Sequence, residues 1–171
     1  MSLRSRSRQC RALLLAGAAA ALAAGGLVAT AGSSQAAGPL PCDIYGSTGA
    51  PCVAAHSTTR ALFAAYNGNL YQVRRASDNA TTNIGLLAAG GYANAAAQDS
   101  FCANTTCIIT VIYDQSSRHN DLTIEGPGGA GGQDTGVPAD ALPVTAGGHI
   151  VYGASFSGVM GYRDNSTSGV A

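Results

Sequence analysis

The sequence predicts an all-β domain with short helices in the connections between strands, and three observations support this class. Residues 107–114 (CIITVIYD) form a run of β-branched and aromatic side chains, as in a strand that is buried on both faces. Turn-forming residues, with Asn67-Gly68 the strongest example, interrupt the other apolar runs. Four cysteines lie in two close pairs, which is typical of a small exported domain stabilised by disulfides.

Residues 1–36 are predicted to be a secretory signal peptide. A start with four arginines precedes an apolar run from Ala12 to about Ala29, and the small residues up to Ala36 and Ala37 suit signal peptidase. A membrane anchor is the alternative, but the run is rich in Ala and Gly and only marginally long enough to cross a bilayer. We therefore expect a secreted, extracellular protein whose mature part, residues 37–171, amounts to one domain.

The charge of the mature part excludes several classes of partner. All nine basic residues are arginines, of which four lie in the signal peptide, whereas all nine acidic residues lie beyond residue 42. Five arginines against nine acids give the mature chain a formal charge of about −4 and no basic patch. Nucleic acid and, after signal cleavage, membranes are therefore not expected partners. We expect a monomer in a polysaccharide environment.

The cysteines of the mature part are predicted to form disulfides. They are Cys42, Cys52, Cys102 and Cys107. Four cysteines allow three connectivities, and proximity favours pairing the first with the second and the third with the fourth. Each such bond closes a short loop and contributes roughly 2–3 kcal/mol in the chain-entropy model. A metal site would need closer cysteine spacing and nearby histidines, but the histidines are scattered at positions 56, 119 and 149, so we expect no metal site.

The remaining elements follow from local patterns along the chain. Ser57 or Thr58 is expected to cap a short helix that reaches Tyr66, and residues 69–77 are expected to form a strand. Residues 77–85 read as a polar turn and residues 90–102 as a short helix. After the strand at 107–114, residues 124–143 read as a Gly/Pro-rich loop, and residues 147–156 as a last strand. Residues 161–171 show no helix or strand pattern. Three or four strands are too few for a complete sandwich.

The most distinctive candidate for chemistry is Asp114, which ends the clearest strand. A carboxylate there could act as an acid, base or nucleophile, but a glycosidase needs two such groups at a defined separation. Asp121 and Glu125 are the nearest partners in sequence, and nothing in the sequence places either one suitably. The alternative is an Asx-turn, in which Asp114 accepts hydrogen bonds from the following backbone N–H groups, and we favour this structural role.

A second charged group lies on the strand at 69–77. Arg74 and Arg75 are adjacent, and neighbouring positions on a strand point to opposite faces, so only one arginine can reach Asp78. We interpret this pair as a solvent-facing ion pair worth a fraction of a kcal/mol. The alternative is that one of these arginines positions a carboxylate under the sheet.

Beyond these patterns, the chain from about Pro41 to Ser116 closely resembles the start of the catalytic domain of α-L-arabinofuranosidase B, glycoside hydrolase family 54. Three motifs carry the resemblance: CVAAHSTTRAL (52–62), GGYANAAAQD (90–99) and IYDQS (112–116). It weakens through the Gly-rich loop and resumes at VYGASFSGVMGYRDN (151–165).

The resemblance implies a concanavalin-like β-sandwich of the jelly-roll type, here incomplete, with disulfides Cys42–Cys52 and Cys102–Cys107. It also implies secreted, retaining exo-enzymes that release terminal α-L-arabinofuranosyl groups from arabinoxylan and arabinan without a cofactor. Tyr113, Asp114 and Gln115 would form an architectural strand end and turn. One departure is the segment Ser117-Arg118-His119-Asn120, where relatives usually carry Gly-x-Gly-Asn, because glycines permit positive φ more readily.

A further departure concerns catalysis. The family's nucleophile Glu and acid/base Asp lie downstream of the matched region, so no catalytic residue is carried over to this sequence. We therefore expect residues 37–171 to be the N-terminal part of such a catalytic domain and the 171-residue chain alone to be inactive. The alternative is a non-catalytic carbohydrate-binding β-sandwich, against which the absence of Trp and the small number of strands count.

Overall fold

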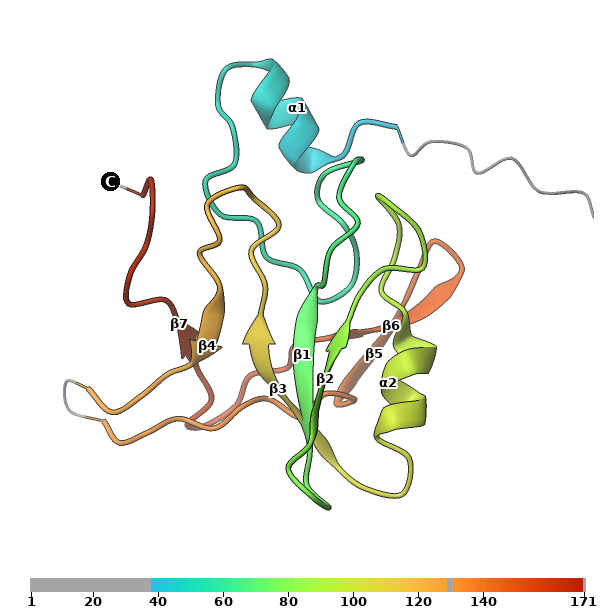
Figure 1. Ribbon diagram of the computed structural model, residues 1–171, viewed down its shortest axis with the longest axis vertical. Helices are drawn as coiled ribbons and strands as arrows, with labels where there is room; N and C mark the ends of the chain where they lie inside the picture. The colour runs from blue at the N-terminus through green and yellow to red at the C-terminus, as the bar shows by residue number, and fades with distance from the viewer. Residues whose placement is uncertain (1–37, 129–130, 171) are drawn as a thin grey trace, which may run out of the picture. The chain divides into compact units, whose positions relative to one another are not determined.

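A computed structural model describes residues 38–128 and 131–170, so the expected signal peptide lies outside the described residues. The described part is mostly β, with antiparallel sheets and two short helices (Figure 1). In chain order the elements are α1 (Pro41–Ser47), β1 (Tyr71–Arg75), β2 (Thr81–Ile84), α2 (Ala95–Phe101), β3 (Cys107–Ile112), β4 (Leu122–Ile124), β5 (Leu142–Ala146), β6 (His149–Gly153) and β7 (Tyr162–Arg163). None of the helices within these residues is long and apolar enough to cross a membrane.

The larger sheet has five strands in the order β2-β1-β3-β4-β7. Antiparallel pairing brings the start of β1 beside the end of β3, where Tyr71 faces Ile112. Tyr71 and Val73 of β1 are fully buried, as the period of a strand with one face on the core requires. The end of β3, where the chain leaves the sheet, therefore lies beside the start of β1, where the chain enters it. Both are at the upper end of these strands in Figure 1.

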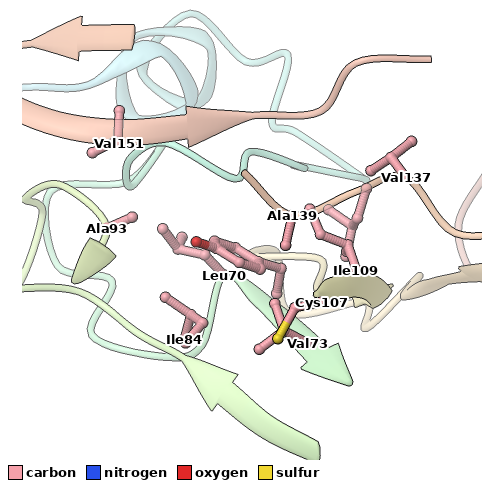
Figure 2. Close-up of a cluster of buried hydrophobic side chains, with 11 residues drawn as sticks. Leu70, Val73, Ile84, Ala93, Cys107, Ile109, Val137, Ala139 and Val151 are labelled. Carbon is pink, nitrogen blue, oxygen red and sulfur yellow. The ribbon is translucent and has the colours of Figure 1, made fainter. Parts of the chain in front are cut away.

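The smaller sheet is the hairpin of β5 and β6, which lies behind the larger sheet in Figure 1. Its two-residue turn is Gly147-Gly148, and both glycines have positive φ (56° and 81°). Tight hairpin turns of this length require positive φ, which glycine adopts without steric cost. Val151 of β6 points into the core that the two sheets share (Figure 2).

The core between the sheets contains aliphatic side chains and one buried amide. Leu70, Ile84 and Ile109 are fully buried in this cluster (Figure 2). Gln98 of α2 is also buried, and its side-chain oxygen accepts a hydrogen bond from the Tyr71 hydroxyl at 2.8 Å. Its amide nitrogen donates to the Ala139 carbonyl at 3.0 Å. Because both ends of this amide are satisfied, α2 is tied to the sheet without leaving an unpaired polar group inside.

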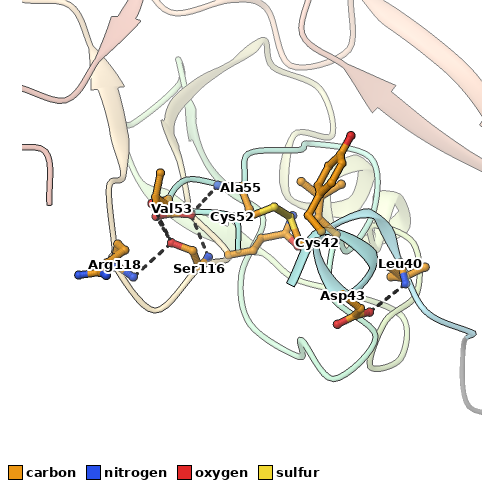
Figure 3. The surroundings of a disulfide bond; sticks show 12 residues. Leu40, Cys42, Asp43, Cys52, Val53, Ala55, Ser116 and Arg118 are labelled. Carbon is orange, nitrogen blue, oxygen red and sulfur yellow. Dashed lines mark hydrogen bonds between the residues drawn. A yellow bond between two sulfur atoms is a disulfide. The ribbon is translucent and has the colours of Figure 1, made fainter. Parts of the chain in front are cut away.

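Two disulfides anchor loops of the fold. Cys42–Cys52 joins α1 to the segment that follows it, and Figure 3 shows this bond beside the turn that contains Ser116. Cys102–Cys107 joins the end of α2 to the start of β3. The first segment gains a further anchor from Asp43, whose carboxylate accepts from the Leu40 and Ala64 backbone N–H groups, both at 2.8 Å.

The expected strands at 69–77, 107–114 and 147–156 correspond to β1, β3 and β6, and the expected helix at 90–102 to α2. The expected helix from Ser57 or Thr58 to Tyr66 is wrong, because this segment is irregular. Its backbone N–H groups bond to distant acceptors: Ala61 N–H donates to the Gly91 carbonyl at 2.8 Å, and Leu62 N–H donates to the Gln115 side chain at 2.7 Å. These long-range bonds replace the helical ones.

Several elements were missed by the sequence patterns. The turn expected at 77–85 contains β2, the loop expected at 124–143 includes the end of β4 and the start of β5, and β7 lies in the tail expected to lack structure. α1 lies in the Pro/Gly-rich segment before Cys52. Strand assignment in β2 comes from pairing with β1 and not from its own apolar content, since only Ile84 of its four residues is buried.

Candidate functional site

Asp114 follows β3 and is 3% exposed, and its carboxylate accepts four hydrogen bonds. One oxygen accepts from the backbone N–H groups of Ala55 (2.7 Å) and Ser116 (2.8 Å). The other accepts from the Ser116 hydroxyl (2.6 Å) and the Asn120 N–H (2.9 Å). A carboxylate has about four acceptor positions, so these donors occupy all of them. Asp114 thus anchors a turn and has no free position for a reacting proton.

The donors around Asp114 also determine its ionisation. Burial disfavours the charged form and by itself would raise the pKa of Asp114. Hydrogen bonds from the Ser116 hydroxyl and from three backbone N–H groups outweigh the burial and hold the pKa of Asp114 below its ordinary value. The group is therefore a carboxylate at neutral pH, in contrast to a general acid, which must carry a proton.

The residues on either side of Asp114 connect other parts of the fold. Tyr113 N–H donates to the Leu70 carbonyl at 2.9 Å, and its hydroxyl donates to the Asn83 side chain at 2.9 Å. Gln115 accepts from Leu62 N–H through its side-chain oxygen, and its side-chain nitrogen donates to the Arg60 carbonyl at 3.1 Å. Tyr113-Asp114-Gln115 thus links the end of β3 to three separate segments.

The turn after Asp114 keeps a left-handed residue without a glycine. His119 has φ of 56°. Non-glycine residues adopt this conformation only rarely, although histidine does so more often than most. Asn120 stabilises the turn through its side chain, which donates to the Val53 carbonyl (2.8 Å) and accepts from Ser168 N–H (2.6 Å).

Other carboxylates lie in ion pairs. Arg75 binds Asp78 through two hydrogen bonds of 2.8 and 2.7 Å in the exposed β1–β2 turn, so Arg75, not Arg74, pairs with Asp78. Arg163 of β7 donates to Glu125 at 2.8 Å, and Gly161 lies against the carboxylates of both Glu125 and Asp134. The ion pair to Arg163 engages one oxygen of Glu125.

Metal-ion chemistry has no evident location in the described part of the chain. No cluster of three or more His, Cys, Asp or Glu side chains that could hold a metal occurs among residues 38–128 and 131–170. His56 binds the Asn120 carbonyl at 2.7 Å, and His149 lies against the Tyr92 ring at 5.2 Å between centroids. His119 lies in the turn after Asp114. His56 thus contacts the turn that contains His119, and His149 packs against a different residue, Tyr92.

A cavity of about 450 Å³ opens between the end of β3 and the start of β1. Two loops line it: the one before β1 contributes Tyr66 and Asn69, and the one after β3 contributes Tyr113, His119 and Asp121. Asp121 accepts a hydrogen bond from Asp114 N–H at 2.8 Å through one oxygen. From the sequence, Asp121 was expected only as a possible partner of Asp114, and the cavity could not be anticipated because its two walls are far apart in the chain.

Comparison with known proteins decides the family. Residues 41–171 match the family described as "Alpha-L-arabinofuranosidase B, catalytic". The chain belongs to this family, glycoside hydrolase family 54. The strand end at Tyr113-Asp114-Gln115 and the two disulfides described above therefore lie within an arabinofuranosidase B-type catalytic region.

Individual relatives agree with this assignment. A probable alpha-L-arabinofuranosidase B from Aspergillus terreus is 60% identical over 151 residues, which are 85% of this chain and 29% of the relative. The alpha-L-arabinofuranosidase B of Emericella nidulans is 53% identical over 170 residues, covering 96% of this chain and 31% of the relative. This arabinofuranosidase B-type chain thus spans less than a third of the length of either relative.

A solved structure of similar fold supports the comparison. The crystal structure of an arabinofuranosidase complexed with arabinofuranosyl-alpha-1,2-xylobiose matches with a TM-score of 0.75 and 53% sequence identity. The match covers 77% of this chain and 28% of that chain. The antiparallel sheets of the arabinofuranosidase B-type region thus correspond to part of that larger structure.

Proposed function

We propose that residues 37–171 form the N-terminal part of the catalytic domain of an α-L-arabinofuranosidase, which removes terminal α-L-arabinofuranosyl groups from arabinoxylan or arabinan with retention of configuration. The observation that carries the proposal is the family match over residues 41–171. Arabinose-containing polysaccharide is the proposed partner, in line with the arabinofuranosyl-xylobiose bound by the related enzyme.

The complete domain is proposed to be a concanavalin-like jelly-roll sandwich. The hairpin of β5 and β6 has two open edges, and exposed apolar side chains lie on it and just after it: Leu142, Ile150, Phe156 and Val159. Open edges and exposed apolar surface are unfavourable in water and are covered in most folded proteins. Further strands of the domain that pair and pack here would remove both.

The 171-residue chain by itself is proposed to lack hydrolytic activity. A retaining glycosidase needs a nucleophilic carboxylate and a proton donor about 5–5.5 Å apart. Of the two carboxylates that line the cavity, Asp114 is fully hydrogen-bonded, which leaves Asp121 alone. The family's catalytic residues are expected downstream of the matched motifs.

A chimera tests this function. Residues 41–171 would replace the corresponding region of the Aspergillus terreus relative, and release of 4-nitrophenol from 4-nitrophenyl α-L-arabinofuranoside would be measured. We expect turnover by the chimera and none by the 171-residue chain. The control is the relative without this region, which should be inactive. A folded but inactive chimera would contradict the proposed function, and turnover by the 171-residue chain would contradict the proposed division of roles.

Secretion is also proposed, with residues 1–36 as the signal peptide. The two disulfides support an oxidising compartment, in which such bonds persist. The intact mass of the protein recovered from the medium should correspond to a chain that begins close to Ala37. A mass that includes residues 1–36 would exclude cleavage at this point.

A further inference from the structure

The cavity between the end of β3 and the start of β1 has the size of a ligand site. Its volume of about 450 Å³ lies within the roughly 300–1,000 Å³ range of small-molecule sites in proteins. Both walls are tied to the sheet, because Tyr113 N–H donates to the Leu70 carbonyl and Asp114 is anchored by its four hydrogen bonds. The cavity is therefore formed by the fold before any ligand arrives.

Two tyrosine rings line this cavity with their hydroxyl groups already engaged by the protein. The Tyr66 hydroxyl donates to the Asn69 carbonyl at 2.6 Å, and the Tyr113 hydroxyl donates to the Asn83 side chain at 2.9 Å. Gly68 lies directly under the Tyr66 ring, because an added Cβ there would come within 2.6 Å of the Tyr66 hydroxyl oxygen. With the hydroxyls fixed, the rings offer mainly apolar surface to a ligand.

Polar groups in the same cavity remain available. One oxygen of Asp121 binds Asp114 N–H, and the other has no hydrogen-bond partner among the described residues. Ser117, His119 and Asn69 also line the cavity, and all three residues are exposed, so their polar side-chain atoms are accessible to a ligand. The charge of Asp121 is close to both rings: after burial, it is the main cause that raises the pKa of Tyr66 and of Tyr113.

The combination of these groups distinguishes between classes of ligand. The imidazole, amide and hydroxyl of His119, Asn69 and Ser117 can each donate as well as accept, whereas a cation uses only the acceptors and leaves the donors unused. A neutral polyhydroxyl ligand both donates and accepts, and its C–H face packs on an aromatic ring.

We propose that this cavity binds one unit of a neutral saccharide, with the free oxygen of Asp121 accepting from a sugar hydroxyl and the Tyr66 and Tyr113 rings contacting the sugar face. Saccharide binding at this cavity is an activity separate from hydrolysis, so the inference goes beyond the proposed function. Only the choice of an arabinose-containing probe rests on that function.

Calorimetric titration of the secreted 171-residue chain tests the proposal, with arabinofuranosyl-xylobiose, xylotriose and tetramethylammonium as probes. We expect at least one of the two saccharides to bind. Asp121→Asn keeps an oxygen for Asp114 N–H but puts an NH₂ group in the cavity, and we expect it to weaken binding at least tenfold. The matched control is Asp164→Asn, since Asp164 also accepts one backbone N–H, from Ser166 at 2.7 Å, outside the cavity. Its affinity should stay within twofold of the wild type.

A second variant separates binding from folding. His119→Gly removes a proposed donor but suits the positive φ at this position, so it should bind the saccharide more weakly while melting at the same or a higher temperature. Failure of both saccharides to bind the folded chain, unchanged affinity in both variants, or displacement of the saccharide by tetramethylammonium would overturn the proposal. The chimera assay is independent of these results, because it measures hydrolysis and not binding at this cavity.

Discussion

Asp114 and Asp78 are both aspartates in turns that follow a strand of the same sheet, yet their surroundings differ in almost every respect. Asp114 is buried and accepts from donors as distant in sequence as Ala55. Asp78 is exposed in the β1–β2 turn, and its partners, Arg75 and Ala80, lie within three residues of it. Both carboxyl groups have a lowered pKa, to about 2 for Asp78.

The comparison shows that a lowered pKa does not by itself indicate importance for the fold. At Asp78 the hydrogen bonds to Arg75 lower the pKa, but solvent competes for every one of these interactions. At Asp114 the donors are backbone N–H groups that would be buried without a partner if the carboxylate were removed. The loss of stability on removing the carboxylate therefore depends on whether its hydrogen-bond donors can bond to water instead, as at Asp78, or stay buried without a partner, as at Asp114.

The largest expected effect is that of Asp114→Asn. The amide of Asn would direct an NH₂ group at backbone N–H donors, so that at least one buried hydrogen bond is lost and two donors face each other. We expect a loss of about 3 kcal/mol in the free energy of unfolding, measured by urea denaturation followed by circular dichroism. Ser116→Ala, which removes a single donor to the same carboxylate, is the control and should cost less. A loss below that of the serine variant would contradict the anchoring role.

An intermediate effect is expected from acid. The folded-state pKa of Asp114 lies below the unfolded value of about 3.9, so its contribution to stability is complete above that value and is lost as the pH falls through the folded-state pKa. Stability measured between pH 5 and pH 2 should therefore fall more steeply in the wild type than in Asp114→Asn.

Added salt distinguishes the contribution of Asp114 to this pH dependence from that of Asp78. Asp78 also has a lowered pKa and contributes with the same sign, but its ion pair is exposed and weakens as ionic strength rises. The difference in slope between wild type and Asp114→Asn should persist in 0.5 M salt. Equal slopes at high salt would mean that Asp114 is not the buried anchor that its hydrogen bonds indicate.

The smallest expected effect is that of Asp78→Asn. This change removes the charge partner of Arg75 in an exposed turn but leaves an oxygen that can accept from Ala80 N–H. Exposed ion pairs contribute little to stability, so the midpoint of urea unfolding should shift only slightly and by less in high salt. A shift as large as that of Asp114→Asn would remove the distinction between the two turns.

Local sequence patterns predicted the structure correctly where the preference of neighbouring residues and the tertiary environment favour the same conformation. The run of β-branched residues at 107–112 became β3, which lies inside the larger sheet with neighbours on both sides. The turn at Asp114 could also be anticipated, because Asp followed by short polar residues favours local hydrogen bonds to the backbone. Spacing alone favoured the cysteine pairs that the structure contains.

Patterns failed where long-range bonds decide the conformation. Residues 57–66 have a helical apolar pattern, but Leu62 N–H donates to Gln115 and Ala64 N–H to Asp43, so the segment stays irregular. These partners lie 53 and 21 residues away, outside any short window of sequence. β2 is polar and becomes a strand by pairing with β1, a contact that its own apolar pattern does not indicate.

The sequence by itself determined the disulfide-bonded, strand-rich class of this arabinofuranosidase B-type region, its central strand and the turn that ends it, because these depend on residues that are close neighbours in the chain. Only the tertiary structure decided that the Asp114 carboxylate is fully occupied and that Tyr66 and Asp121 meet in one cavity. Both outcomes depend on the antiparallel pairing of β1 with β3. This pairing places the loop before β1 next to the loop after β3, at the same end of the two strands.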